Sequence, residues 1–266
     1  MALLHHSIAR FAPDASRRLL VLHGIFGQGR NWSTVANVLV QLRPDWEIAL
    51  VDLRMHGKSQ GFAAPHTLAA CAEDVAALAD SLGGITAILG HSFGAKVVLA
   101  YLHPERAQRV EGLPVQSWIV DADPSARPPA GESMQMLTLL RSLPRDWETR
   151  ERFVGALMES GLTPAVAGWM ATNLVREGNS FRLGFDLDAI ESLLRDYFAA
   201  DFESLVRNVR TDLRVVRATG SPILDDVQPR LQTAGVRVHA VTGGHWLNAE
   251  NPSGVAQLLA AELPRQ

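Results

Sequence analysis

The 266-residue chain contains a single cysteine, Cys71, so no internal disulfide can form. Because disulfides are typical of oxidising compartments, the sequence favours a cytoplasmic location. Residues 1–11 are interrupted by His5, His6 and Arg10 and lack the continuous apolar segment of a signal peptide. No segment approaches the ~18–20 apolar residues that a membrane-spanning helix needs, so we expect no membrane partner.

Charge of one sign and aromatic residues are also scarce. The chain has 25 Lys and Arg against 28 Asp and Glu, and no basic run that could follow a phosphate backbone. We therefore expect no nucleic-acid partner. Aromatic residues make up 6 %, which gives no indication of an aromatic-substrate cage. No metal-ligand constellation or phosphate-binding loop is present, so we expect no cofactor.

Strand-like and helix-like segments alternate through most of the chain. Short apolar segments predict strands at residues 18–23, 47–53, 85–89, 117–120, 213–218 and 236–241. Apolar residues at helical spacing predict intervening or following helices at residues 31–42, 68–82, 95–102 and 255–263. This alternation predicts an α/β fold with a mostly parallel central sheet and helices on both faces.

Residues 124–208 break the alternation, since they contain helical segments and no good strand. The helical segments are predicted at residues 134–143, 147–159, 164–175 and 189–208. The simplest organisation is a core domain of residues 1–123 and 209–266 with a helical cap, residues 124–208, inserted between two strands. Such a cap would lie over the strand ends, set substrate size and exclude water.

Residues 90–94 match the pattern Gly-x-Ser-x-Gly between a predicted strand and a predicted helix, which is the context that a nucleophile elbow requires. Ser92 would sit on a sharp turn, and Gly90 and Gly94 would remove side chains that collide there. A serine hydroxyl is a poor nucleophile until a base takes its proton. The best candidate base is His245, which follows two glycines after the last predicted strand.

An acyl-transfer site also needs two backbone N–H groups directed at the tetrahedral oxygen. One is expected from Phe93, the residue after the nucleophile, and the other from Ile25 in the glycine-rich loop after the first strand, with Phe26 as the alternative. Phe26 is also expected to contact substrate, as are His91 and Trp246, which neighbour the nucleophile and the base.

Four segments together carry a resemblance, namely residues 23–27, 52–59, 90–94 and 244–250. They resemble small esterases and thioesterases of the α/β-hydrolase superfamily, a group that includes bacterial acyl-ester and acyl-CoA hydrolases and a mitochondrial relative. The resemblance covers residues 20–102 and 213–263 well, whereas the helical insertion matches only in kind.

The acid of a catalytic triad does not stand in its usual position. In most α/β-hydrolases it follows the strand after the cap, but here Ser221 occupies that place. The resembling group shares this departure, and by that resemblance the acid is Asp121 at the end of the strand before the cap, with Ser221 as an auxiliary hydrogen-bonding group. Asp225 and Asp226 stay open as alternatives.

These residues predict a serine hydrolase that cleaves small to medium carboxylic esters through an acyl-enzyme. The same triad could cleave a thioester, lactone, amide or carbon–carbon bond, because fold and triad do not choose among these. A non-catalytic binding module that retained the pocket is the alternative from another class. The expected partner is a small-molecule acyl ester or thioester, and the sequence does not distinguish a monomer from a homo-oligomer.

Overall fold

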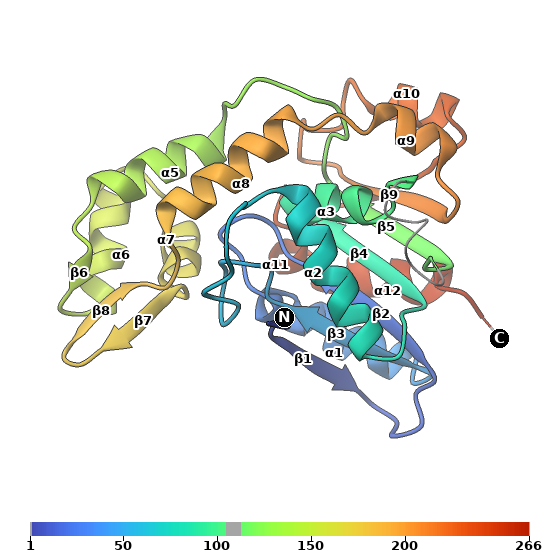
Figure 1. The fold of residues 1–266 in the computed structure, drawn as a ribbon, viewed down its shortest axis with the longest axis horizontal. Helices are drawn as coiled ribbons and strands as arrows, with labels where there is room; N and C mark the ends of the chain where they lie inside the picture. Colours follow the sequence, from blue (N-terminus) through green and yellow to red (C-terminus); the bar gives the residue numbers. More distant parts are fainter. Residues whose placement is uncertain (1, 105–112, 266) are drawn as a thin grey trace.

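The structure, a computed structural model, describes residues 2–104 and 113–265 around a central seven-stranded sheet (Figure 1). The strand order is β1-β3-β2-β4-β5-β9-β10, and every neighbouring pair is parallel except β1 with β3. The strands are β1 (His6–Arg10), β2 (Arg17–Leu22), β3 (Trp46–Val51), β4 (Ala87–His91), β5 (Gln116–Val120), β9 (Asp212–Ala218) and β10 (Arg237–Val241). The predicted fold class is therefore confirmed.

Helices cover both faces of the sheet because the strands are apolar on both sides. Along β2, Leu19 and Val21 join one buried cluster, and Leu20 and Leu22 join the other. This is the period-two alternation of a strand. The helices of the first face are α1 (Ser33–Leu42) and α12 (Pro252–Glu262), and those of the second are α2 (Leu68–Ser81), α3 (Phe93–Tyr101) and α10 (Gln228–Thr233). Two short elements, η1 (Gly29–Trp32) and α11 (Leu247–Glu250), lie in loops.

The edge strand β1 was not predicted from the sequence. Its five residues are exposed or half-buried, so they show no apolar run. It runs antiparallel to β3, with His6 opposite Val51 and Arg10 opposite Glu47. This pairing makes β1 the outermost strand on that side of the sheet.

The insertion between β5 and β9 stands to one side of the core (Figure 1). Its helices are α5 (Glu132–Ser142), α6 (Arg150–Glu159), α7 (Pro164–Ala171), α8 (Leu187–Ala199) and α9 (Glu203–Asn208). The expectation of helices alone is wrong, because β6 (Asp146–Trp147), β7 (Leu174–Glu177) and β8 (Ser180–Leu183) form a small antiparallel sheet. The single helix expected at residues 189–208 is divided into α8 and α9.

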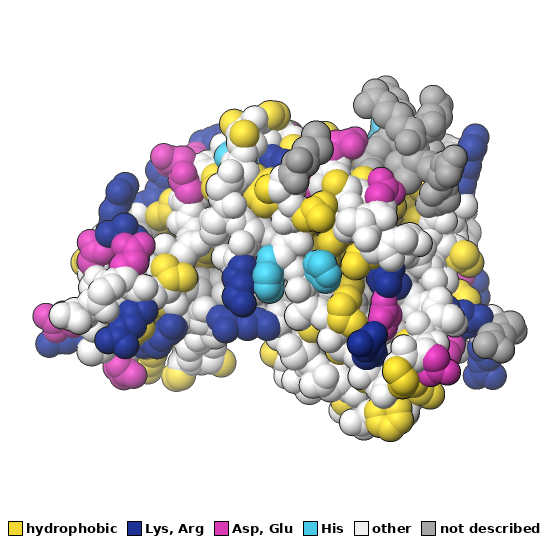
Figure 2. All heavy atoms as spheres, turned by 60° about the horizontal axis from the view of Figure 1, so that its bottom comes forward, with side chains coloured by type: hydrophobic (Ala, Val, Ile, Leu, Met, Phe, Trp, Pro, Cys, Tyr) yellow, Lys and Arg dark blue, Asp and Glu magenta, His cyan; other side chains and the backbone are white. Residues whose placement is uncertain are grey.

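Charged side chains of both signs are interspersed on the face shown in Figure 2 and do not gather into a basic stripe there. Within the described part of the chain, no helix is both long and apolar enough to cross a membrane.

Candidate active site

Ser92 lies where β4 passes into α3, at the carboxyl edge of the sheet. Its φ of 52° and ψ of −114° are strained for a residue that is not glycine. Its N–H donates to the carbonyl oxygen of Val120 at the end of β5, 3.0 Å away. The turn therefore places the serine side chain beyond the strand ends, at the start of a helix whose first N–H groups lack intrahelical partners.

The two glycines around Ser92 are required by close backbone approach. A Cβ at Gly90 would lie 2.1 Å from the carbonyl oxygen of Gly94. A Cβ at Gly94 would lie 2.6 Å from the carbonyl oxygens of Leu22 and His23. Any side chain at either position would force the elbow apart, which gives the Gly-x-Ser-x-Gly pattern its physical meaning here.

Asp121 and His245 form a close pair at the same edge of the sheet. Nδ1 of His245 lies 2.8 Å from Oδ2 of Asp121, although 124 residues separate them in the chain. Asp121 follows β5 directly, has a φ of 47° and is fully buried. The pair is arranged as an acid that orients an imidazole through one ring nitrogen.

The other carboxylate oxygen of Asp121 is also held. Oδ1 accepts the N–H of Ala218 at the end of β9, 3.3 Å away. Burial would raise the pKa of Asp121, but hydrogen bonds from His245 and from the buried Ser221 outweigh it and keep the pKa below its usual value. Asp121 is thus an ionised carboxylate in a buried site, with Ser221 as an additional donor.

The two alternative acids lie elsewhere. Asp225 is half exposed and its carboxylate pairs with the guanidinium of Arg217, 2.5 Å away. Asp226 is exposed. The structure thus brings Asp121, and neither of these carboxylates, to the imidazole of His245.

His91 supports the loop that carries the candidate base. Burial, helped by the nearby His245, lowers the pKa of His91 to about 3, so the ring is neutral at pH 7. Its Nε2 lies 2.8 Å from the carbonyl oxygen of His245 and donates to it, since a carbonyl can only accept. On the other side, the N–H of Gly244 donates to a carboxylate oxygen of Glu250, 2.6 Å away. His91 therefore acts on the loop of His245 by hydrogen bonding.

The loop after β2 is held by two buried histidines that stack edge to face, His23 and His56, with ring centroids 5.0 Å apart. His23 accepts the N–H of Leu53 and its other ring nitrogen donates to the carbonyl of Gly24. Nε2 of His56 accepts the N–H of Phe26 at 3.2 Å. Burial, with His23 nearby, lowers the pKa of His56 to about 3, so the ring keeps its accepting nitrogen.

This contact separates the two candidate oxyanion donors in the loop. The N–H of Phe26 already donates to His56. Ile25 precedes Phe26 on the loop and follows Gly24, where an added Cβ would lie 3.4 Å from the Cβ of Ser92. The geometry therefore favours Ile25 over Phe26 as the partner of Phe93. Phe26 has a φ of 60° and its ring is buried against Phe185 of the insertion.

The insertion contacts the loop after β2 through Asn173, a buried residue that sequence reasoning missed. Its side-chain amide donates to the carbonyl of Phe26 at 2.9 Å and accepts from Gln28 at 2.6 Å. The sequence placed Asn173 inside a helix expected at residues 164–175, whereas the structure has it in the turn between α7 and β7, and an isolated asparagine carries no recognisable sequence signal.

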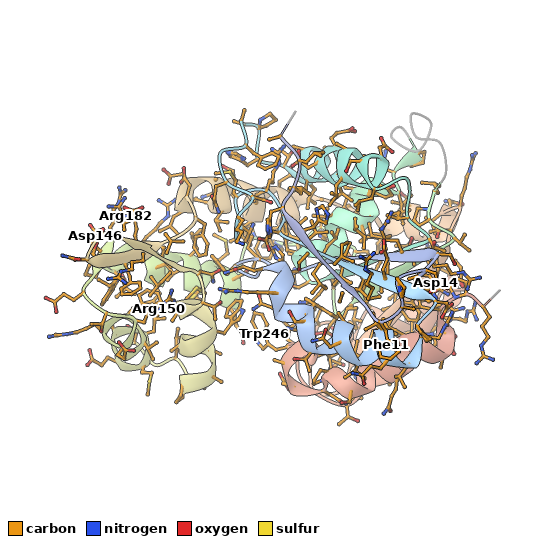
Figure 3. All side chains as sticks on the ribbon, turned by 90° about the horizontal axis from the view of Figure 1, so that it is seen from below. Phe11, Asp14, Asp146, Arg150, Arg182 and Trp246 are labelled. Carbon is orange, nitrogen blue, oxygen red and sulfur yellow. The ribbon has the colours of Figure 1, made fainter. Side chains whose placement is uncertain are left out.

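Trp246 lies between the insertion and the core, where Figure 3 labels it. Its ring packs against Trp169 of α7, with centroids 4.4 Å apart, and against His245 at 5.4 Å. Trp246 therefore joins the loop of the candidate base to the insertion.

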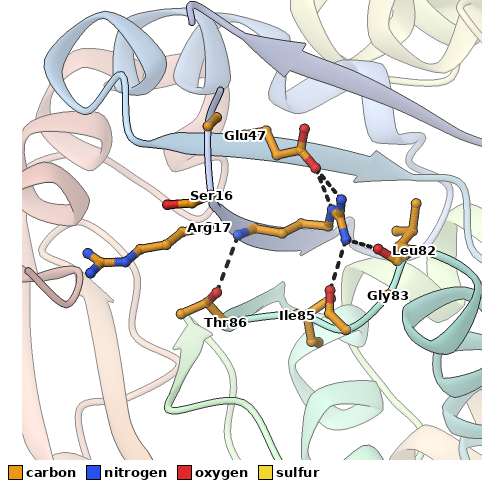
Figure 4. Close-up of a pocket in the computed structure, with 10 residues that line it drawn as sticks. Ser16, Arg17, Glu47, Leu82, Gly83, Ile85 and Thr86 are labelled. Carbon is orange, nitrogen blue, oxygen red and sulfur yellow. Dashed lines mark hydrogen bonds and ion pairs between the residues drawn. The ribbon is translucent and has the colours of Figure 1, made fainter. Parts of the chain in front are cut away.

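A hollow of about 370 Å³ lies at the opposite, amino-terminal edge of the sheet (Figure 4). Arg18 spans it, binding the carboxylate of Glu47 and the carbonyl oxygens of Leu82 and Gly84. These contacts engage the guanidinium, and the residues that line the hollow do not include Ser92, Asp121 or His245. In residues 2–104 and 113–265, no cluster of His, Cys, Asp and Glu is arranged to hold a metal ion.

Known proteins resemble this chain, some over part of its length and others over most of it. It is 26 % identical over 251 residues to the sn-1-specific diacylglycerol lipase ABHD11 of Xenopus tropicalis, covering 87 % of this chain and 73 % of that protein. It is 37 % identical over 107 residues to Lipase LipV of Mycobacterium tuberculosis, covering 40 % of this chain but only 39 % of that lipase. A solved marine microorganism esterase superposes with a TM-score of 0.83 at 21 % identity, covering 98 % and 99 % of the two chains.

Residues 19–258 match the sequence profile of the Alpha/beta hydrolase family. The match spans both parts of the sheet and the insertion between them. The superposition on the marine esterase shows the same fold. The chain is a hydrolase, and it belongs to the alpha/beta hydrolase family.

Proposed function

We propose that the protein hydrolyses carboxylic esters through an acyl-enzyme formed on Ser92. The observation that carries the proposal is the 2.8 Å contact between His245 and the buried, ionised Asp121, at the sheet edge where the strained turn presents Ser92. Names of the similar proteins, two lipases and an esterase, support an ester as the bond that is cleaved.

In this mechanism, Nε2 of His245 takes the proton of Ser92 while the serine oxygen attacks the acyl carbonyl. Asp121 holds the imidazole in the tautomer that leaves Nε2 free to accept, and it stabilises the imidazolium that forms. The N–H groups of Ile25 and Phe93 hold the oxyanion. The imidazolium then protonates the leaving alcohol, and water activated by the same imidazole releases the acyl group.

The proposed substrate is a small-molecule acyl ester that enters beneath the cap. The rings of His91 and Trp246 pack against His245, and Phe26 lies on the loop after β2. Phe26 and His91 are buried and engaged in contacts that shape the site. Trp246 is the one of the three that is only half buried, so we assign it the direct substrate contact. The single cysteine, which is buried, supports a reducing compartment such as the cytoplasm.

The test is hydrolysis of p-nitrophenyl esters from acetate to palmitate, with acetyl-CoA and palmitoyl-CoA alongside. We expect turnover by the wild type and none by Ser92→Ala, whereas Ser192→Ala, at an exposed serine on α8, should keep full activity. A fluorophosphonate probe should label the wild type and not Ser92→Ala. Turnover of thioesters alone would move the substrate class to acyl-CoA. No turnover and no labelling would overturn the proposed reaction at Ser92.

A further inference from the structure

Lys96 is a fully buried lysine one turn after the proposed nucleophile, on α3. A buried ammonium is costly unless its three donors are satisfied. Here Nζ donates to the carbonyl oxygens of Ser125, Tyr197 and Ala200, at 2.7, 2.8 and 2.8 Å. All three bonds therefore go to the backbone, and none of the three acceptors is a catalytic group.

The three carbonyls belong to the two chain segments that connect the cap to the core. Ser125 lies at the start of the inserted segment, before α5, and Tyr197 and Ala200 lie at the carboxyl end of α8, near the return of the chain to the core. Carbonyl groups at a helix carboxyl end lack intrahelical partners and attract a cation. The two segments also bind each other, because Phe202 donates to Pro124 and Arg127 donates to Phe198, both at 2.9 Å.

The side chain of Tyr197 extends this arrangement to the proposed nucleophile. Its ring packs against Phe93, with centroids 5.9 Å apart, and Nζ of Lys96 lies 4.8 Å from the ring centroid. Arg127 donates to the phenol oxygen at 3.3 Å. Burial raises the pKa of the Tyr197 phenol, and hydrogen bonds from Arg127 and Ser92 act in the opposite direction. The phenol is thus neutral and lies beside the hydroxyl of Ser92.

We propose that Lys96 is a positioning residue that fastens both ends of the cap to the helix of the nucleophile and thereby holds the Tyr197 phenol at Ser92. The inference rests on the proposed function, since it assigns Ser92 the nucleophilic role. It makes the attachment of the cap to α3 a condition for a correctly placed nucleophile.

The three hydrogen bonds that Lys96 donates respond to pH. Burial lowers the pKa of Lys96 to about 8; Asp123 and Asp201 act to raise it, and Arg127 acts to lower it. The other titratable group against Lys96 is the Tyr197 phenol, which stays neutral because its pKa is raised. A neutral amine has two N–H donors for three carbonyl oxygens, so one cap connection loses its partner as the pH rises through about 8.

The first experiment is a double-mutant cycle on p-nitrophenyl ester hydrolysis with Lys96→Met, Tyr197→Phe and the double variant. We expect Lys96→Met to lower kcat about tenfold, because the Tyr197 phenol would no longer be held at Ser92. If Lys96 acts through Tyr197, the double variant is no slower than Lys96→Met alone. Losses that multiply, or a Lys96→Met variant with wild-type kcat, would overturn the inference. Lys58→Met is the matched control, because Lys58 is exposed and is the only other lysine in the chain.

The second experiment uses the wild type and Tyr197→Phe, so it does not depend on Lys96→Met folding. Selective 13C labelling of lysine gives two Cε signals, from Lys58 and Lys96. We expect the Lys96 signal to titrate near pH 8 and wild-type kcat to fall over the same range, with no such fall in Tyr197→Phe. A Lys96 titration with unchanged wild-type kcat would refute the coupling. A wild type without turnover would instead refute the proposed function and leave the titration unaffected.

Discussion

Replacing Asp121 with asparagine changes one atom of the candidate triad and keeps its shape. The structure fixes which way the new amide would point. Oδ1 accepts the N–H of Ala218, and that buried donor needs an acceptor, so the amide oxygen takes this place. The amide nitrogen then falls where Oδ2 now lies, 2.8 Å from Nδ1 of His245.

An NH₂ group facing Nδ1 forces that nitrogen to accept, and the ring proton moves to Nε2. His245 then cannot take the proton of Ser92. A wrong tautomer of this kind costs on the order of 10⁴-fold in kcat, or about 5 kcal/mol in the activation barrier. The measurement is kcat for the best p-nitrophenyl ester in the wild type and in Asp121→Asn, with thermal melting to show that both are folded.

Asp225→Asn is the matched control, because Asp225 is half exposed and pairs only with Arg217 among the described residues. Its loss should change kcat by less than a few fold, as is usual for a surface ion pair. Equal and small losses in the two variants would remove Asp121 from the triad, and a large loss in Asp225→Asn alone would reassign the acid.

Three further predictions concern stability and the cap. The unfolding free energy should fall as the pH drops from 6.5 towards 3, because buried neutral histidines such as His56 bind protons only after unfolding. The expected slope is up to about 1.4 kcal/mol per pH unit for each such histidine, and denaturant titrations of His56→Gln should show a smaller slope than those of the wild type. Gly94→Ala should lose about 1–3 kcal/mol or fail to fold, whereas Gly155→Ala, with open space around its position, should melt no lower than the wild type. Asn173→Ala should lower kcat/KM about tenfold by freeing the loop after β2, while Asn208→Ala, at an exposed site, should not; ester assays distinguish them.

The fold was predictable because the central strands bury both faces and therefore appear as apolar segments between amphipathic helices. Strand β1 was not predictable, since its residues lie exposed or half-buried at the edge of the sheet and form no apolar run. The strands of the insertion were not predicted for another reason, which is their length. β6 has two residues, and β7 and β8 have four each, which is too short for a periodicity to emerge.

Ser92 and His245 stand in local patterns of glycines, so their candidacy follows from short segments of sequence. The position of Asp121 does not follow from a short segment of sequence. It depends on β5 lying beside β9, which brings the backbone of Ala218 to one carboxylate oxygen and the loop of His245 to the other. The choice of Ile25 over Phe26 depends on a single bond from the Phe26 N–H to His56. Both contacts are tertiary, and no local pattern encodes them.

The insertion, which we propose is a cap, touches each part of the proposed catalytic apparatus separately. Tyr197 lies beside the nucleophile, Asn173 holds the loop that carries the proposed oxyanion donor, and Trp169 packs on Trp246 next to the base. A segment with only a steric role would not need these three contacts. Since the same segment would also enclose the acyl chain, changes in the cap should alter chain-length preference and kcat together, rather than KM alone.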